Sequence, residues 1–193
     1  METVPNTGIV LCTGLEPGIV VGIQSGPFFD FDANVLRVLL TRPGALGIRL
    51  HFDQFRPNFP TELYAVASDD RMDIRDSRDD DQAYFKSTGE NLSRRNLPET
   101  VRTNFNDNRK PAGSAFFSKT ILERSTMLGP ASNPSATSKI RFFVKDAGPD
   151  CRDSNGIPCF TLVAIGVKAD GTLDGPFIMS AQPCPPNCPT GDE

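Results

Sequence analysis

His51 is the only histidine in the chain, so any histidine-dependent chemistry would have to use it. A histidine that acts as a general base needs a neighbouring side chain to orient it and a cleft that admits the substrate. The sequence offers no serine or cysteine with a second histidine. The segment around His51, Gly47–Phe52, resembles a later segment, Lys139–Val144, in which Phe143 holds the position of His51. Equivalence to a phenylalanine favours a half-buried position on a strand surface. We therefore expect a structural role for His51, with catalysis as the alternative.

Arg49 and Arg141 occupy the same place in the two similar segments. Because a guanidinium group presents a planar fork of donors, such a pair could bind two anions or carboxylates. An arginine also covers apolar surface with its stem while its head reaches solvent or a nearby aspartate. We favour this second reading. The first would make Arg49, His51 and Arg141 the ligand-binding residues.

Five cysteines could supply metal chemistry or disulfides. They are Cys12, Cys151, Cys159, Cys184 and Cys188. The last four could in principle form a zinc site of four thiolates, but neither pair has the two-residue spacing of a zinc knuckle, and prolines flank the tail cysteines. A disulfide in the loop, between Cys151 and Cys159, or in the tail requires an oxidising compartment, and an odd count leaves one cysteine over in any fully bridged scheme. We expect unbridged thiols and no cofactor.

Composition and charge argue against two classes of partner. A formal net charge of −4 and a pI near 5.1 are unlike the basic face of a nucleic-acid-binding protein. No apolar run approaches the length needed to cross a bilayer. The first residues, Met1–Pro5, lack the basic and apolar regions of a secretory signal. We expect a cytoplasmic protein, with export by a non-standard route left open.

A short module occurs twice along the chain, and such a repeat indicates how the fold is built. Helical periodicity predicts a helix capped by Asp30 or Asp32 in the first copy and one over Phe117–Leu128 in the second, where a further helix capped by Asn96 comes before it. Two predicted strands follow in each copy, over Gly47–Phe52 and Glu62–Ala67 in the first and Lys139–Val144 and Phe160–Val167 in the second. The pattern predicts an α+β fold of two helix–strand–strand repeats with antiparallel hairpins, with the helices packed on one face of the sheet.

The domain boundaries follow from the composition. Residues 1–68 form the first, diverged repeat, 69–95 a charged connector, and 96–193 the second repeat with its tail rich in cysteine and proline. The connector interleaves many aspartates with arginines and lacks the spacing of a calcium loop, so we expect it to be solvated. The two repeats are expected to be related by a pseudo-twofold axis, so that one chain imitates a homodimer.

From about Asn91 to the tail, the chain resembles a group of small uncharacterised bacterial proteins. Four motifs carry the resemblance: Ala115–Leu122, Lys139–Val144, Thr161–Gly171 and Cys184–Cys188. In the family pattern these correspond to a helix opening with aromatics, a strand near G-I-R-x-Y-F, a strand near T-L-V-x-V-G-V-D-x-x-G and a C-P-P-x-C tail. The resemblance implies fold and modularity, and it transfers no catalytic residue.

The absence of a convergent acid–base set, together with the duplication, favours a non-enzymatic module for protein interaction or assembly. Its expected partner is another protein or a further copy of itself. The alternative is a small-ligand or metal-binding protein, or an enzyme, with its pocket between the repeats.

Overall fold

The computed structural model describes residues 27–53, 62–69, 72–75, 81–103, 114–124, 127–129, 136–146, 160–179 and 182–184. Its strands are β1 (Phe28–Asp32), β2 (Gly47–Phe52), β3 (Leu63–Ser68), β4 (Tyr84–Lys86), β5 (Asn91–Leu92), β6 (Ser114–Ser118), β7 (Thr137–Asp146), β8 (Phe160–Lys168), β9 (Leu173–Met179) and β10 (Gln182–Cys184). Its helices are α2 (Ala33–Leu40), α3 (Glu99–Thr103) and α4 (Lys119–Arg124), with a 3₁₀ turn, η1 (Arg94–Asn96). None of the helices in these ranges is long and apolar enough to cross a bilayer.

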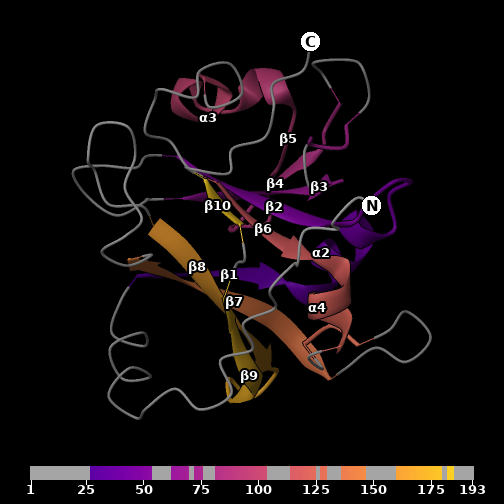
Figure 1. Cartoon of the computed structure of the whole chain (residues 1–193), viewed down its shortest axis with the longest axis vertical. Coiled ribbons are helices and arrows are strands. Elements are labelled where there is room, and N and C mark those ends of the chain that lie inside the picture. The colour runs from indigo at the N-terminus through magenta and orange to yellow at the C-terminus, as the bar shows by residue number, and fades with distance from the viewer. Residues whose placement is uncertain are drawn as a thin grey trace, which may run out of the picture.

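The predicted α+β class and antiparallel hairpins are confirmed, but the strands form two sheets where a single sheet was expected (Figure 1). Sheet A has four strands in the order β1-β7-β8-β9, and sheet B has six in the order β10-β6-β2-β3-β4-β5. Every pairing within the two sheets is antiparallel. The two predicted hairpins, β2–β3 and β7–β8, therefore lie in different sheets.

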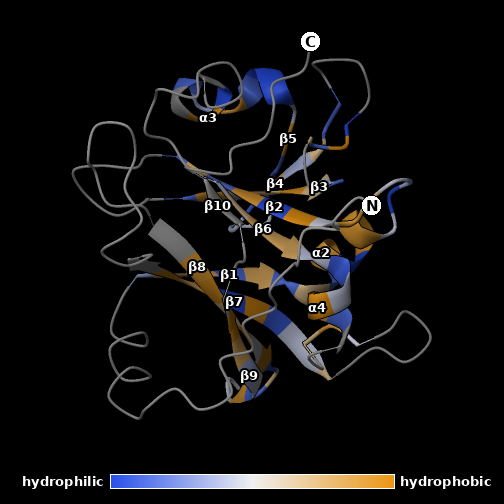
Figure 2. Cartoon of the chain, in the orientation of Figure 1, coloured by the Kyte–Doolittle hydropathy of each residue, from blue (hydrophilic) through white to orange (hydrophobic). Residues whose placement is uncertain are grey.

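The main core lies between the two sheets. Alternate residues of each strand point into it, as the period of two along a strand requires: from sheet B they include Ile48, Leu50 and Ala115, and from sheet A Ile140 and Phe142. Helices α2 and α4 lie together at one side of the sheets and add Leu36, Leu39 and Leu122 to the same core. Apolar colouring concentrates on these facing strands and helices in Figure 2.

Asp32 is the residue that caps α2, one of the two aspartates predicted for this role. Its carboxylate accepts a hydrogen bond from Asn34 N at 2.7 Å, which satisfies one of the free amides in the first turn. The alternative start at Asp30 is wrong, because the residues from Phe28 to Asp32 form β1 and pair with β7. Local periodicity could not reveal a strand whose partner lies more than a hundred residues away.

A smaller core covers the outer face of sheet B. Tyr64 and Val66 of β3 pack there against Tyr84, Leu97 and Val101. Part of the segment predicted as a solvated connector thus belongs to the sheet, since β4 and β5 continue it beyond β3. The prediction of a solvated segment is wrong for Tyr84, which is 0% exposed. Packing its ring against β3 removes apolar surface from water. The acidic composition of the segment gave no sign of this burial.

The strands directly before α2 and α4 each pair with the hairpin in the other half of the chain. β1 precedes α2 but pairs with β7, whereas β6 precedes α4 but pairs with β2. Each of the two predicted hairpins is therefore extended by a strand from the other half of the chain. This exchange places β6 beside the side chains of Arg49 and His51.

Candidate functional site

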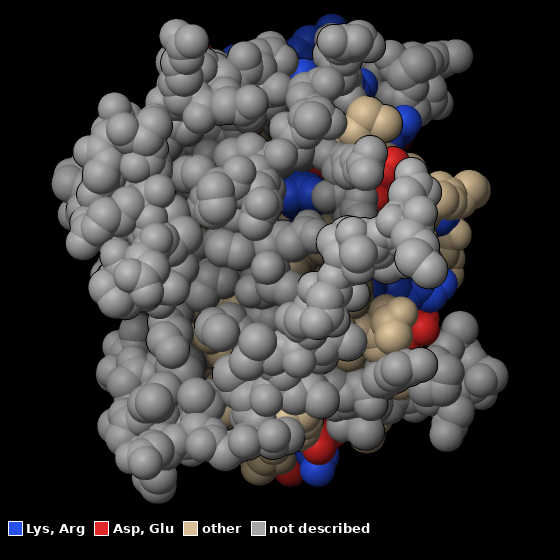
Figure 3. All heavy atoms as spheres, viewed as in Figure 1, with Lys and Arg blue, Asp and Glu red and all other residues tan. Residues whose placement is uncertain are grey.

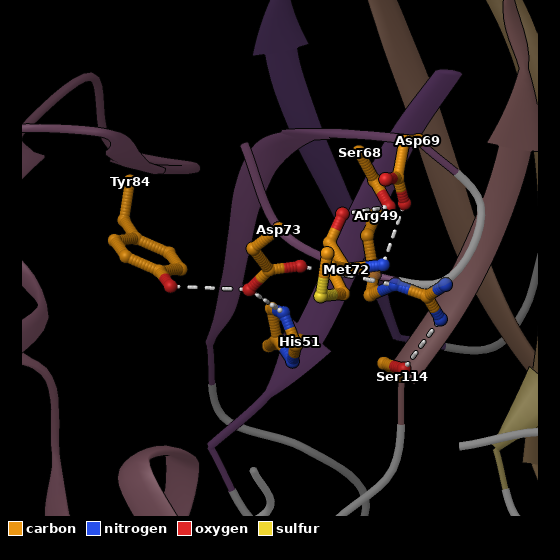
Figure 4. A network of polar contacts seen from close by, with 8 residues as sticks. All are labelled: Arg49, His51, Ser68, Asp69, Met72, Asp73, Tyr84 and Ser114. Atoms are coloured by element: carbon orange, nitrogen blue, oxygen red, sulfur yellow. Dashed lines mark hydrogen bonds and ion pairs between the residues drawn. The ribbon is translucent and has the colours of Figure 1, made fainter. Parts of the chain in front are cut away.

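A cluster of buried charged side chains lies on the outer face of sheet B (Figure 4). Arg49 and His51 alternate along β2 with Ile48, Leu50 and Phe52, which point into the main core. The two polar side chains consequently point to the opposite face. Both residues are 0% exposed, so the prediction that His51 is half-buried is wrong. Arg49 is among the largest fully buried side chains of the described structure.

Asp73 is the centre of this cluster. Its Oδ2 lies 2.8 Å from Nε2 of His51 and accepts a hydrogen bond from the Tyr84 hydroxyl at 3.1 Å. Its Oδ1 lies 3.8 Å from Nε of Arg49. One carboxylate thus contacts a histidine, a tyrosine and an arginine from two different strands.

A tight turn after β3 brings Asp73 to this position. Met72 N donates to Oδ1 of Asp69 at 2.7 Å, and the Ser68 hydroxyl donates to the Met72 carbonyl at 2.8 Å. Ile74 N then donates to the Ala67 carbonyl at 2.7 Å. These bonds fold the chain back along β3, so that the aspartate side chain reaches over β2.

Arg49 also contacts β6, the strand contributed by the other half of the chain. Its Nη1 donates to the Ser114 hydroxyl at 3.2 Å, and its guanidinium lies 5.5 Å from the ring centroid of Phe116. A buried guanidinium needs such partners, because an unpaired charge inside a protein is strongly unfavourable. The cluster therefore links the two halves of the chain as well as β2 and the turn.

The electrostatics of the cluster favour an ionised Asp73. Burial on its own raises the pKa of this carboxyl, but the His51 charge and hydrogen bond, the Arg49 charge and the Tyr84 hydrogen bond outweigh burial and lower the pKa below its ordinary value. Burial, together with the Asp73 charge and its hydrogen bond, raises the pKa of Tyr84. The tyrosine accordingly stays protonated and serves as a donor.

A carboxylate that fixes one nitrogen of a histidine is half of a general-base arrangement. The other half is access for a reactant, and here the side chains of both His51 and Asp73 are almost completely buried, at 0% and 3% exposure. The geometry is well suited to a different task. It fastens the turn that carries Asp73 to the outer face of sheet B, with Tyr84 closing one side.

Arg141, the third predicted ligand-binding residue, lies elsewhere. It alternates with Ile140 and Phe142 of the main core, so its side chain lies on the outer face of sheet A. Arg49 lies on the outer face of sheet B, on the other side of the core. Its guanidinium donates to both carboxylate oxygens of Asp30, at 2.7 and 2.8 Å, and stacks on the Phe28 ring at 4.0 Å from the centroid. Hydrogen bonding to Asp30 raises the pKa of Arg141. The structure brings Arg49 and His51 together and leaves Arg141 apart from them.

Sequence reasoning missed Asp73, Tyr84 and Ser114. The serine could have been suspected had the exchange of β6 been foreseen, because it is the cross-strand partner of His51. Nothing in the sequence distinguishes Asp73 from the aspartates around it. Its role depends on the turn after β3, which places its side chain over β2, and the sequence does not show this placement.

The predicted cysteine site falls largely outside the described residues. This applies to Cys151, Cys159 and Cys188, and the side chain of Cys184 is likewise outside the description. Among the side chains that are described, no group of three or more histidines, cysteines or carboxylates could hold a metal ion. The zinc and disulfide alternatives stay predictions.

A scan against protein-family models and searches of curated proteins and of solved structures found no match.

Proposed function

We propose that this chain is a non-enzymatic interaction or assembly module, built by internal duplication as a pseudodimer in a single chain. The observation that carries the proposal is the reciprocal exchange of β1 and β6. Strand exchange between identical copies is a common route to dimers, because each copy replaces its own contact with the same contact made by its partner. Here both copies lie on one chain, and each completes the sheet of the other.

The strand registers support this duplication in detail. The recurring motifs match Phe31 with Phe117, Ile48 with Ile140, and Ala67 with Gly166. In sheet A, Phe31 pairs with Ile140, which pairs with Gly166. In sheet B, Phe117 pairs with Ile48, which pairs with Ala67. The same matched positions therefore face each other in both sheets.

The strand order supports it as well. Sheet B contains β6 followed by the consecutive strands β2, β3 and β4, and sheet A contains β1 followed by β7, β8 and β9. Each sheet thus contains three consecutive strands from one unit beside one strand from the other, and sheet B continues with β5 at one edge and β10 at the other. We place the junction between the units after α3, because Leu97 and Val101 pack on sheet B.

The two outer faces have diverged, which suits a module that presents unlike surfaces. Arg49 is buried with Asp73 on sheet B, whereas the matching Arg141 stays partly exposed, with 24% of its side chain accessible, beside Asp30. On the face seen in Figure 3, the described acidic and basic side chains are intermixed along the margin. A protein partner fits such a surface better than a nucleic acid, which requires a basic one.

The alternative function, binding of a small ligand, is favoured by one observation: Asp73 orients His51 as a binding or catalytic site would require. A ligand at this cluster must displace part of a packed network. The geometry does not favour a pocket lined by Arg49, His51 and Arg141 together, because Arg141 lies on the other sheet.

Capture of a partner from the source organism, with the full chain as bait, tests the proposal. A partner protein should be retained by the wild type and by the exposed-site variant Glu90→Ala, and lost from the double variant Phe28→Ala with Arg141→Ala. The folded variant His51→Gln should still retain it. The alternative function replaces ours if no protein is captured and the wild type instead retains a small molecule that His51→Gln does not.

A further inference from the structure

We propose that the outer edge of β1 is a docking site for an extended segment of a protein partner with proline at its centre, bound as β10 is bound to β6. The inference rests on the proposed duplication and names the surface and the kind of partner. It starts from an asymmetry between the exchanged strands. In the described structure β6 lies between β2 and β10, whereas β1 pairs only with β7 and forms the edge of sheet A.

The hydrogen-bond pattern determines which backbone groups of β1 face outward. Val144 N donates to the carbonyl of Pro27 at 3.3 Å, which continues the register in which Phe28 faces Phe143. Hydrogen-bonded and non-hydrogen-bonded pairs alternate along an antiparallel ladder. The backbone groups of Phe29 and Phe31 therefore point towards β7, and those of Phe28 and Asp30 point away from it.

The backbone groups of β6 alternate in the same way. Lys119 N donates to the carbonyl of Leu46 at 2.8 Å, in register with the β2–β6 ladder. Backbone groups of Ala115 and Phe117 consequently point towards β2. Those of Ser114 and Phe116 point towards β10, where they face Cys184 and Gln182.

These positions are equivalent in the two strands. Matching Phe31 with Phe117 places Phe28 at the position of Ser114 and Asp30 at that of Phe116. The two residues that bind β10 in one copy are thus the two whose backbone groups face outward in the other. A strand added to β1 would repeat the arrangement already present at β6.

The chemistry of the occupant follows from β10. Pro183 faces Ala115, a position where the added strand turns its own amide away, so the missing N–H of proline costs no ladder bond. The neighbouring residues must each offer an N–H and a carbonyl, as Gln182 and Cys184 do. The partner segment is therefore an extended stretch with proline between two residues that can pair through their backbone, and the proline lies opposite Phe29.

β1 lacks the features that protect other edges. The opposite edge of sheet A, β9, contains Gly175 and Pro176, and the far edge of sheet B, β5, spans only Asn91–Leu92. Proline and short length are both common protection against strand addition. β1 contains neither, the charge of Asp30 is paired with Arg141, and Phe28 is 48% exposed beside the edge. Strand addition to an exposed edge is an established mode of peptide recognition.

The test uses the full chain and a fluorescent peptide, Ser-Ala-Gln-Pro-Ser-Ala, with fluorescence anisotropy as the measurement. We expect saturable binding, and slower amide exchange of Phe28 and Asp30 in the complex with no change at Ser114 and Phe116. A matched peptide with glutamine and proline exchanged should bind about tenfold or more weakly, since proline then occupies a position that must donate a hydrogen bond.

Variants of the protein give an independent check. Phe28→Pro removes an outward N–H and should weaken peptide binding about tenfold relative to Phe28→Ala, which keeps it. Equal binding of the two peptides, or protection of Ser114 in place of Phe28, would overturn the docking site. Because the peptide comparison leaves the protein unaltered, it decides the question even if a variant folds poorly. The proposed duplication is tested separately, by co-expressing the two halves of the chain and asking whether they assemble. A failure of peptide binding would leave that result unchanged.

Discussion

Asp73 is the residue on which the buried cluster depends. It provides the carboxylate for both Arg49 and His51, whose side chains are almost completely buried. Removing one member of such a group leaves the others as uncompensated charges in a medium of low polarity. The aspartate therefore compensates the charges buried on the outer face of sheet B.

Truncating this side chain should be severe. We expect Asp73→Ala to lower the free energy of unfolding by about 3–5 kcal/mol, the range for breaking a buried ion pair. The control Glu90→Ala, at an exposed position, should change it by less than about 0.5 kcal/mol. Urea denaturation followed by circular dichroism measures both. A loss no larger than that of the control would show that the cluster contributes little to folding.

Acid should weaken the same contribution. The folded-state pKa of Asp73 is lowered, so its stabilising effect is complete above the unfolded pKa and is lost as the pH falls through the folded pKa. The stability difference between wild type and Asp73→Asn should be constant near neutral pH and shrink below about pH 4. Urea denaturation across that pH range provides the measurement. A difference that grows on acidification would contradict the assigned ionisation.

Among single residues, the sequence drew attention to Arg49 because an arginine holds the same place in two similar segments, and to His51 because it is the only histidine. It did not reveal Asp73, since burial of an aspartate depends on partners from β2 and β4. Phe143 matches His51 in the repeat and suggested a half-buried position for the histidine. Both residues prove to be buried.

At the scale of elements, β2 and β7 were predictable from their alternation of apolar and polar residues, and β3 and β8 from their short runs of apolar residues. β1 and β6 were not, because each is a short strand directly before a helix and its partner lies in the other half of the chain. Gly47 marks one place where this distant pairing constrains the sequence. A Cβ atom there would fall on the backbone carbonyl of Phe117 and the ring of Phe116.

Gly47→Ala should therefore disturb the junction of β2 with β6. We expect a loss of about 1–3 kcal/mol of unfolding free energy, as for other overpacked sites. Leu46→Ala is the matched control, because this neighbouring side chain is 57% exposed. Thermal unfolding of the two variants compares them directly. Equal melting temperatures would mean that the two strands approach less closely than described.

At the scale of the whole molecule, the repeat predicted from sequence supplied the idea of a pseudo-twofold, but not the exchange of strands. The exchange depends on contacts between residues far apart in the chain, which local patterns do not encode. If the proposed duplication is right, neither unit can complete its sheet alone. The main core contains residues from both halves of the chain, among them Ile48 and Ile140.

Sedimentation of the chain divided between Asn108 and Arg109 tests the central claim most directly. Two co-expressed halves should assemble as a 1:1 complex with the 21.0 kDa mass of the intact chain and its circular dichroism spectrum, because each half supplies a strand to the other. Each half alone should self-associate or remain unfolded. Two halves that sediment as separate, folded monomers would contradict the exchange of strands and with it the pseudodimer.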